Sequence, residues 1–299
     1  MFIIKHKKIF IGISVALVLL SLISLFVFGL HVGIDFKGGT LEEVTYKTTR
    51  PDQAVLSNDL SKLGFGVVNL QPTGELGYII KTRALTDAEH TTLLQTLSTD
   101  PANPATEVNF DSIGPSVGRE LTRKAIIAVI LISLAIICFI AFAFRKVSKP
   151  VSSWRYGIIA ILTLIHDVLI PVGIFAALSH FYGAELDTLF VVAVLTILGL
   201  SVSDTIVIFD RIRENLKSIQ AKEIDFGTVV GHSLEESYVR SICTSLTVIL
   251  VLLSLVFFGP STTKYFALML TAGMFFGTYS SIFLASPLLV LVSEKQKKS

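Results

Sequence analysis

The chain has 299 residues, of which 52% are hydrophobic and only 16% are charged. Soluble domains carry roughly 25% charged residues, so a large part of this chain is expected to lie in lipid, where charge is costly. The net charge of +2 and the lack of a basic, aromatic-rich stripe argue against nucleic-acid binding. Cys138 and Cys243 are too few for a disulfide framework and do not form a C-x-x-C metal site.

Six segments are long and apolar enough to span a membrane as helices, which takes about 20 residues. They cover residues 9–30, 125–144, 156–179, 186–209, 242–258 and 265–292. The first is longer than the apolar part of a signal peptide and is expected to remain as a span. The last is expected to be tilted, or broken near Pro287.

Basic residues mark the cytoplasmic connections of membrane proteins. Here they gather at 5–8, 145–155, 211–240 and 295–298. Both termini are therefore expected in the cytoplasm, and the long segment after the first span is expected outside. Glu235 and Glu236 are expected in a solvated cytoplasmic loop.

Residues 31–124 read as an α+β domain. Strands are expected at 40–48, 65–70, 78–82 and 106–113, with one helix starting at Pro51 and another capped by Thr86. The order β-α-β-β-α-β is that of the ferredoxin-like motif. The predicted organisation is therefore 1–30 for the N-terminus and first span, 31–124 for this domain, and 125–299 for a five-helix bundle.

Ionisable residues inside spans are the first candidates for function, because one at a helix centre costs about 2.5–3.5 kcal/mol. His166 and Asp167 lie near the middle of the third span. Adjacent helical positions point about 100° apart, so the two need not share a partner. They suit proton handling, or alternatively form a static hydrogen-bonded pair that holds two helices together.

Asp204 lies in the cytoplasmic half of the fourth span, between Ser203 and Thr205. These small residues allow close helix approach and supply hydroxyl groups. A cation that moves toward and away from a buried carboxyl would make it release and bind a proton; a static hydrogen bond is the alternative. Arg240, at the start of the fifth span, is long enough to extend toward Asp204 or to snorkel to the interface.

No motif of a soluble enzyme is present: there is no P-loop, no H-E-x-x-H and no G-x-S-x-G. The sequence therefore predicts a protein that is not an enzyme and needs no cofactor. Any work that it performs must draw on a gradient or a partner. The layout of one span, a domain and five spans resembles one half of a two-part transporter.

Five sequence blocks, in order along nearly the whole chain, resemble the SecD/SecF family of the resistance-nodulation-division transporter superfamily. They are Gly33-Ile-Asp-Phe-Lys-Gly-Gly-Thr40, Ser116-Val-Gly-Arg-Glu-Leu121, Ile165-His-Asp-Val168, the run 201–215, and Arg240-Ser-Ile-Cys-Thr-Ser245. The signature positions of the first block are Gly33, Asp35, Phe36, Gly38 and Gly39. The topology fits the SecF branch better than the SecD branch.

The resemblance implies an accessory subunit of the Sec protein-export machinery in the bacterial inner membrane, driven by the proton-motive force. It implies a SecD-like subunit, the SecYEG channel, a YajC-like accessory protein and the exported polypeptide as partners. Asp204 matches the proton-relay aspartate of the family, and Arg240 matches its mobile cationic partner. The chain departs from the family at Ser203, where asparagine is common, and in the segment before Arg240, where an asparagine is absent.

Two other functions fit the same layout. One is half of a lipid or small-molecule exporter of the superfamily, whose exterior domain should then offer an apolar pocket. The other is a scaffold that only stabilises a partner complex, in which Asp204 and Arg240 would be static and jointly replaceable.

Overall fold

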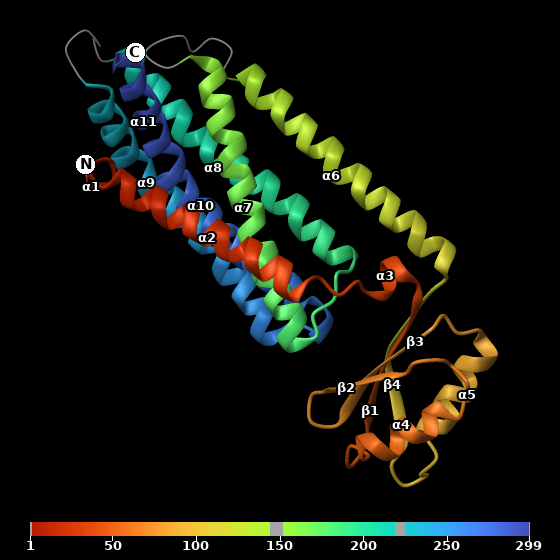
Figure 1. Ribbon diagram of the computed structural model, residues 1–299. Coiled ribbons are helices and arrows are strands. Elements are labelled where there is room, and N and C mark those ends of the chain that lie inside the picture. The colour runs from red at the N-terminus through yellow and green to blue at the C-terminus, as the bar shows by residue number, and fades with distance from the viewer. Residues whose placement is uncertain (1, 144–151, 219–224, 299) are drawn as a thin grey trace. The chain divides into compact units, whose positions relative to one another are not determined.

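The computed structural model describes residues 2–143, 152–218 and 225–298. The basic residues expected at 145–149 and at 222 lie outside the described residues. The chain forms two compact units (Figure 1). One consists of Met1–His31 and Ala128–Ser299, and the other of Val32–Ile127.

Long helices make up the first unit, and they confirm the six expected spans. In chain order they are α1 (Phe2–Lys5), α2 (Lys7–Phe28), α6 (Pro115–Ala143), α7 (Ser153–Tyr182), α8 (Thr188–Ser218), α9 (Phe226–Phe258), the 3-10 turn η1 (Ser261–Thr263), α10 (Lys264–Ser280), the π-helical turn η2 (Ser281–Ala285) and α11 (Ser286–Lys298). Among the described residues, six of these stretches are long and apolar enough to cross a membrane. With 33 residues, α9 is about 50 Å long, so it extends well beyond a hydrocarbon core of about 30 Å.

Helices α7, α8 and α10 form the buried centre of this unit, whereas α2, α6 and α9 keep most of their apolar residues exposed. Glycines permit the closest approaches. A Cβ on Gly273 of α10 would lie 2.3 Å from Ile197 of α8, and a Cβ on Gly173 of α7 would lie 2.6 Å from the Ser21 backbone of α2. Side chains larger than hydrogen would therefore separate the helices.

The sixth span is continuous but irregular. Its helix widens into the π-helical turn η2 directly before Pro287. Proline has no N–H to give to the carbonyl four residues earlier, and π-helical turns inside helices are a common response to such a defect. The expected irregularity near Pro287 is thus a turn that stays helical. It begins with the buried Ser281, and the buried Ser286 follows it as the first residue of α11.

The second unit confirms the ferredoxin-like order. Its elements are α3 (Ile34–Lys37), β1 (Gly39–Tyr46), α4 (Gln53–Ser61), β2 (Asn69–Thr73), β3 (Gly77–Thr82), α5 (Asp87–Leu97) and β4 (Ala105–Ile113). The strands pair antiparallel in the order β2-β3-β1-β4. Leu60 of α4 and Leu93 of α5 pack with Val44 and Ile80 of the sheet in one core. Thr86 caps α5 as expected, in a reciprocal capping box with Glu89.

Two expected boundaries in this unit are wrong. The second strand begins at Asn69 and includes Pro72, whereas residues 65–70 were expected. Because β2 is an edge strand, Pro72 removes no hydrogen bond from the interior of the sheet. The first helix is capped by Asp52, whose carboxylate accepts hydrogen bonds from the N–H groups of Ala54 and Val55, so Pro51 lies just before the helix.

Candidate functional site

Asp167 of α7 is fully buried and joins three helices of the first unit. Its Oδ1 lies 2.8 Å from Nδ1 of the neighbouring His166. Its Oδ2 accepts hydrogen bonds from Ser201 of α8 and, at 2.7 Å, from Ser280 of α10. One carboxyl group therefore fixes the spacing of the central helices.

His166 bonds to Asp167, although adjacent helical positions point apart, because both side chains bend toward each other. The ring of His166 stacks on Tyr279 of α10 with centroids 6.3 Å apart. Its Nε2 is buried and has no hydrogen-bond partner among the described residues. The pair therefore links helices, as the static hypothesis requires, and leaves one buried ring nitrogen without a hydrogen-bond partner among the described residues.

Asp204 of α8 lies between α9 and the π-helical turn. The hydroxyls of Ser241 in α9 and Ser281 in η2 approach its carboxyl group. Nevertheless, Oδ2 of Asp204 and Oγ of Ser241 are both buried and make no hydrogen bond within the described part of the chain. The centre of the unit therefore holds a carboxyl group with unused hydrogen-bonding capacity.

The remaining candidate residues of the fourth and fifth spans do not all face Asp204; some are buried and others are exposed. Thr205 is buried, and its Oγ1 lies 2.8 Å from Oγ of Ser281. Ser203 is exposed, as is Arg240, and no ion pair joins Arg240 to Asp204 in the described structure. Since successive helical residues point about 100° apart, α9 turns Ser241 toward Asp204 and turns Arg240 away.

Three serines complete the site. Ser201 belongs to the hydroxyl-bearing stretch expected around Asp204, whereas Ser280 and Ser281 were not expected. Ser201, Ser280 and Ser281 supply hydroxyls to the two carboxyl groups. A signal for the serine face of α9 was available, because four buried serines of that helix recur at intervals of four residues and so share one face. They are Ser233, Ser237, Ser241 and Ser245.

Glu235 and Glu236 are exposed, as expected, but they lie in α9, which begins at Phe226, and the loop expected for them is wrong. Glu236 accepts hydrogen bonds from Arg211 at 2.8 Å and from Asn215 at 2.7 Å, both on α8. The two helices are therefore tied together beyond the expected end of the fourth span, which keeps Asp204 and Ser241 in register.

The Gly-Gly signature lies in the second unit, where its backbone passes very close to the backbone of neighbouring segments. Gly33 caps the short helix α3, which contains Asp35 and the buried Phe36. Gly38 has φ +78° and ψ 149°, a combination that only glycine adopts readily. A Cβ on Gly38 would lie 2.9 Å from Cα of Pro115, and one on Gly39 would lie 2.8 Å from the Thr82 carbonyl oxygen. The signature thus serves the packing of α3, β1 and the start of α6.

Comparison with known proteins decides the family. The family model "Protein export membrane protein SecD/SecF, C-terminal" matches residues 93–295, and the model "SecD/SecF GG Motif" matches residues 23–49. The protein translocase subunit SecF of Thermobaculum terrenum is 43% identical over 300 residues, which cover 96% of this chain and 92% of that protein. The chain belongs to the SecF family. SecF of Anaerolinea thermophila is 37% identical over 97% of this chain and 93% of its own length.

A solved structure of the translocon-associated membrane protein SecDF from Thermus thermophilus has the same fold as this SecF family member. The match has a TM-score of 0.82 and 29% identity, and it covers 98% of this chain. This chain spans only 38% of the SecDF chain. Protein export is thus the process that this multi-pass membrane protein serves, as a translocase subunit.

Proposed function

We propose that this SecF family member pairs with a SecD-like subunit and uses proton flow into the cytoplasm to assist polypeptide export. The size relation to SecDF supports the pairing, since SecDF has room for a second, comparable half. The exposed apolar faces of α2, α6 and α9 supply surface that such a partner would cover. The SecYEG channel, a YajC-like protein and the exported chain are the other partners in this proposal. The protein would lie in the inner membrane with both of its termini in the cytoplasm.

The observation that carries the proton-coupling proposal is the unpartnered Oδ2 of Asp204, between helices that polar groups already link. Carboxyl and imidazole groups are those through which side chains exchange protons near neutral pH. Asp204, Asp167 and His166 form a succession of such groups across α8 and α7. In a static link, every buried polar atom would be expected to have its partner.

In this proposal Arg240 takes part in proton transfer when α9 moves. It precedes Ser241 on α9, whose hydroxyl approaches Asp204. A rotation of α9 by about one residue, 100°, would bring the guanidinium to the position that Ser241 occupies. The cation would then favour the ionised carboxylate and release its proton. Such a rotation would break the hydrogen bonds that Arg211 and Asn215 donate to Glu236.

The test is Asp204→Asn in a reconstituted system with the SecD-like subunit and the SecYEG channel. We expect loss of the export that depends on the proton gradient, with membrane insertion intact. Asp210→Asn is the matched control, because Asp210 lies on the same helix and is exposed. Near-normal, gradient-dependent export by Asp204→Asn would refute the relay.

A double variant distinguishes the proton relay from the scaffold alternative. If Asp204→Asn combined with Arg240→Gln supports gradient-dependent export as well as the unaltered chain does, both groups are static. The relay requires the double variant to be as inactive as Asp204→Asn alone.

A further inference from the structure

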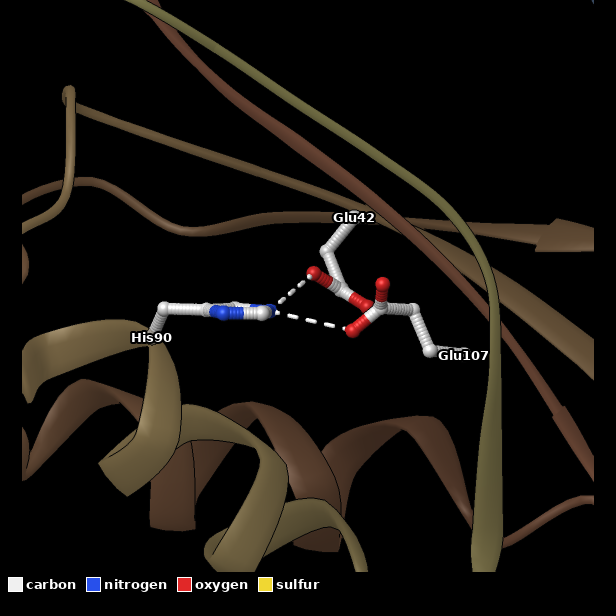
Figure 2. A group of neighbouring side chains, drawn as sticks. All are labelled: Glu42, His90 and Glu107. Atoms are coloured by element: carbon white, nitrogen blue, oxygen red, sulfur yellow. Dashed lines mark hydrogen bonds and ion pairs between the residues drawn. The ribbon is translucent and has the colours of Figure 1, made fainter. Parts of the chain in front are cut away.

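A second group of ionisable side chains meets in the α+β unit. Glu42 of β1, His90 of α5 and Glu107 of β4 converge on one point (Figure 2). The Nε2 atom of His90 lies 3.0 Å from Oε2 of Glu42 and 3.3 Å from Oε2 of Glu107. One ligand atom from each residue lies within 4.8 Å of the other two. Three separate elements therefore aim nitrogen and oxygen donors at a common centre.

A β-bulge brings Glu107 into this group. Glu42 pairs with Phe110, but Val44, two residues further along β1, pairs with Glu107 rather than with Val108. Regular alternation from Phe110 would turn Val108 toward the helices and Glu107 away from them. The extra residue leaves Val108 58% exposed instead and moves Glu107 to the face of Glu42. Bulges that redirect a side chain in this way are common beside binding sites.

The group contains a buried polar atom without a partner in the described part of the chain. Glu42 is fully buried at 0% exposure, and its Oε1 has no hydrogen-bond partner among the residues that the structure describes. Burial, and secondarily the charge of Glu107, raise the pKa of Glu42 to about 8. The buried Oε1 is therefore an unsatisfied polar atom, which is unfavourable unless a ligand supplies its partner.

We propose that Glu42, His90 and Glu107 bind a divalent transition-metal ion of the zinc class. Zinc binds imidazole nitrogen and carboxylate oxygen at about 2.0–2.2 Å, which places tetrahedral ligands about 3.4 Å apart. The separations of 3.0 and 3.3 Å around His90 Nε2 are close to this value. The ion would take the place of a proton between Nε2 and the carboxylates, and bidentate binding by Glu42 would also give its Oε1 a partner.

The surroundings suit a three-ligand site with a fourth position for water. The ring of His90 stacks on Phe110 with centroids 3.8 Å apart and planes at 24°, which holds Nε2 toward the carboxylates. The side chain of Glu107 is 40% exposed, so an ion can enter from solvent. Magnesium and calcium prefer six or more oxygen ligands, and a nitrogen donor with only two carboxylates disfavours both.

The test uses the full chain, purified in detergent without a polyhistidine tag and stripped with EDTA. Titration with ZnCl₂ against a chromophoric chelator should show one tight site. His90→Gln and Glu107→Gln should each weaken zinc binding by roughly tenfold or more, because even changes to residues that only hydrogen-bond to metal ligands cost about 10–100-fold. His232→Gln is the matched control, because His232 is 58% exposed and faces Glu236 at 3.5 Å in the other unit. This control should leave the affinity unchanged.

Cobalt supplies an independent readout. Co²⁺ in the site should give the visible absorption of a four-coordinate ion, which His90→Gln abolishes and His232→Gln preserves. Equal zinc affinity in the unaltered chain, His90→Gln and Glu107→Gln would overturn the proposal, as would loss of binding in His232→Gln alone. Displacement of zinc by an equal concentration of Mg²⁺ would also overturn it, because the donor set would then not select a transition metal.

Discussion

Glu42→Gln should stabilise the metal-free α+β unit at neutral pH. The pKa of Glu42 is raised from 4.5 to about 8 in the folded chain, so folding favours the protonated form. The contribution of Glu42 to stability is therefore fully present below pH 4.5 and is lost as the pH rises from 4.5 to about 8. Each pH unit in this window corresponds to 1.36 kcal/mol. At pH 7 the accumulated loss is about 3 kcal/mol. Glutamine stays neutral at every pH, so the Glu42→Gln variant does not undergo this loss of stability.

Hydrogen exchange of the full chain, with EDTA present, measures this directly. Peptides from β1, α5 and β4 should exchange more slowly in Glu42→Gln than in the unaltered chain at pH 7, after correction for intrinsic rates. The difference should vanish near pH 4.5. Glu75→Gln is the control, because Glu75 is exposed in the turn between β2 and β3. Faster exchange in Glu42→Gln across the whole pH range would refute the assignment of a buried, protonated carboxyl.

Two further substitutions test the packing argued above. Gly38→Ala should destabilise the α+β unit by about 1–3 kcal/mol, because its backbone conformation strains an alanine and the Cβ would meet Pro115. Thermal unfolding followed by hydrogen exchange should show no such loss for Gly114→Ala, where a Cβ meets nothing within 4 Å. Asp167→Asn should lower the free energy of unfolding of the helical unit by about 1–3 kcal/mol, since it leaves buried hydrogen-bonding groups mismatched. A detergent-denaturation midpoint equal to that of the unaltered chain would contradict the linking role of Asp167.

The sequence alone determined the elements whose signals are local. Six apolar stretches specified six helices, because an apolar run of that length can satisfy its backbone in lipid only as a helix. The α+β order followed from alternating strands, a helix cap at Thr86 and glycine-rich turns. The sequence also identified Asp204 and the pair His166–Asp167 as candidate functional residues, because ionisable residues inside membrane spans are rare. The order of five short motifs indicated the family.

Tertiary structure decided which of these residues meet. Whether Ser241 or Arg240 faces Asp204 depends on the rotation of α9 against α8, which packing sets and one sequence does not reveal. The π-helical turn before Pro287 places Ser281 beside Asp204, a shift that no spacing rule predicts. Likewise, Glu107 reaches Glu42 and His90 only because β4 bulges by one residue, and pairing between distant strands determines that bulge. Local pattern therefore specified the helices and strands, and contacts distant in sequence specified the sites.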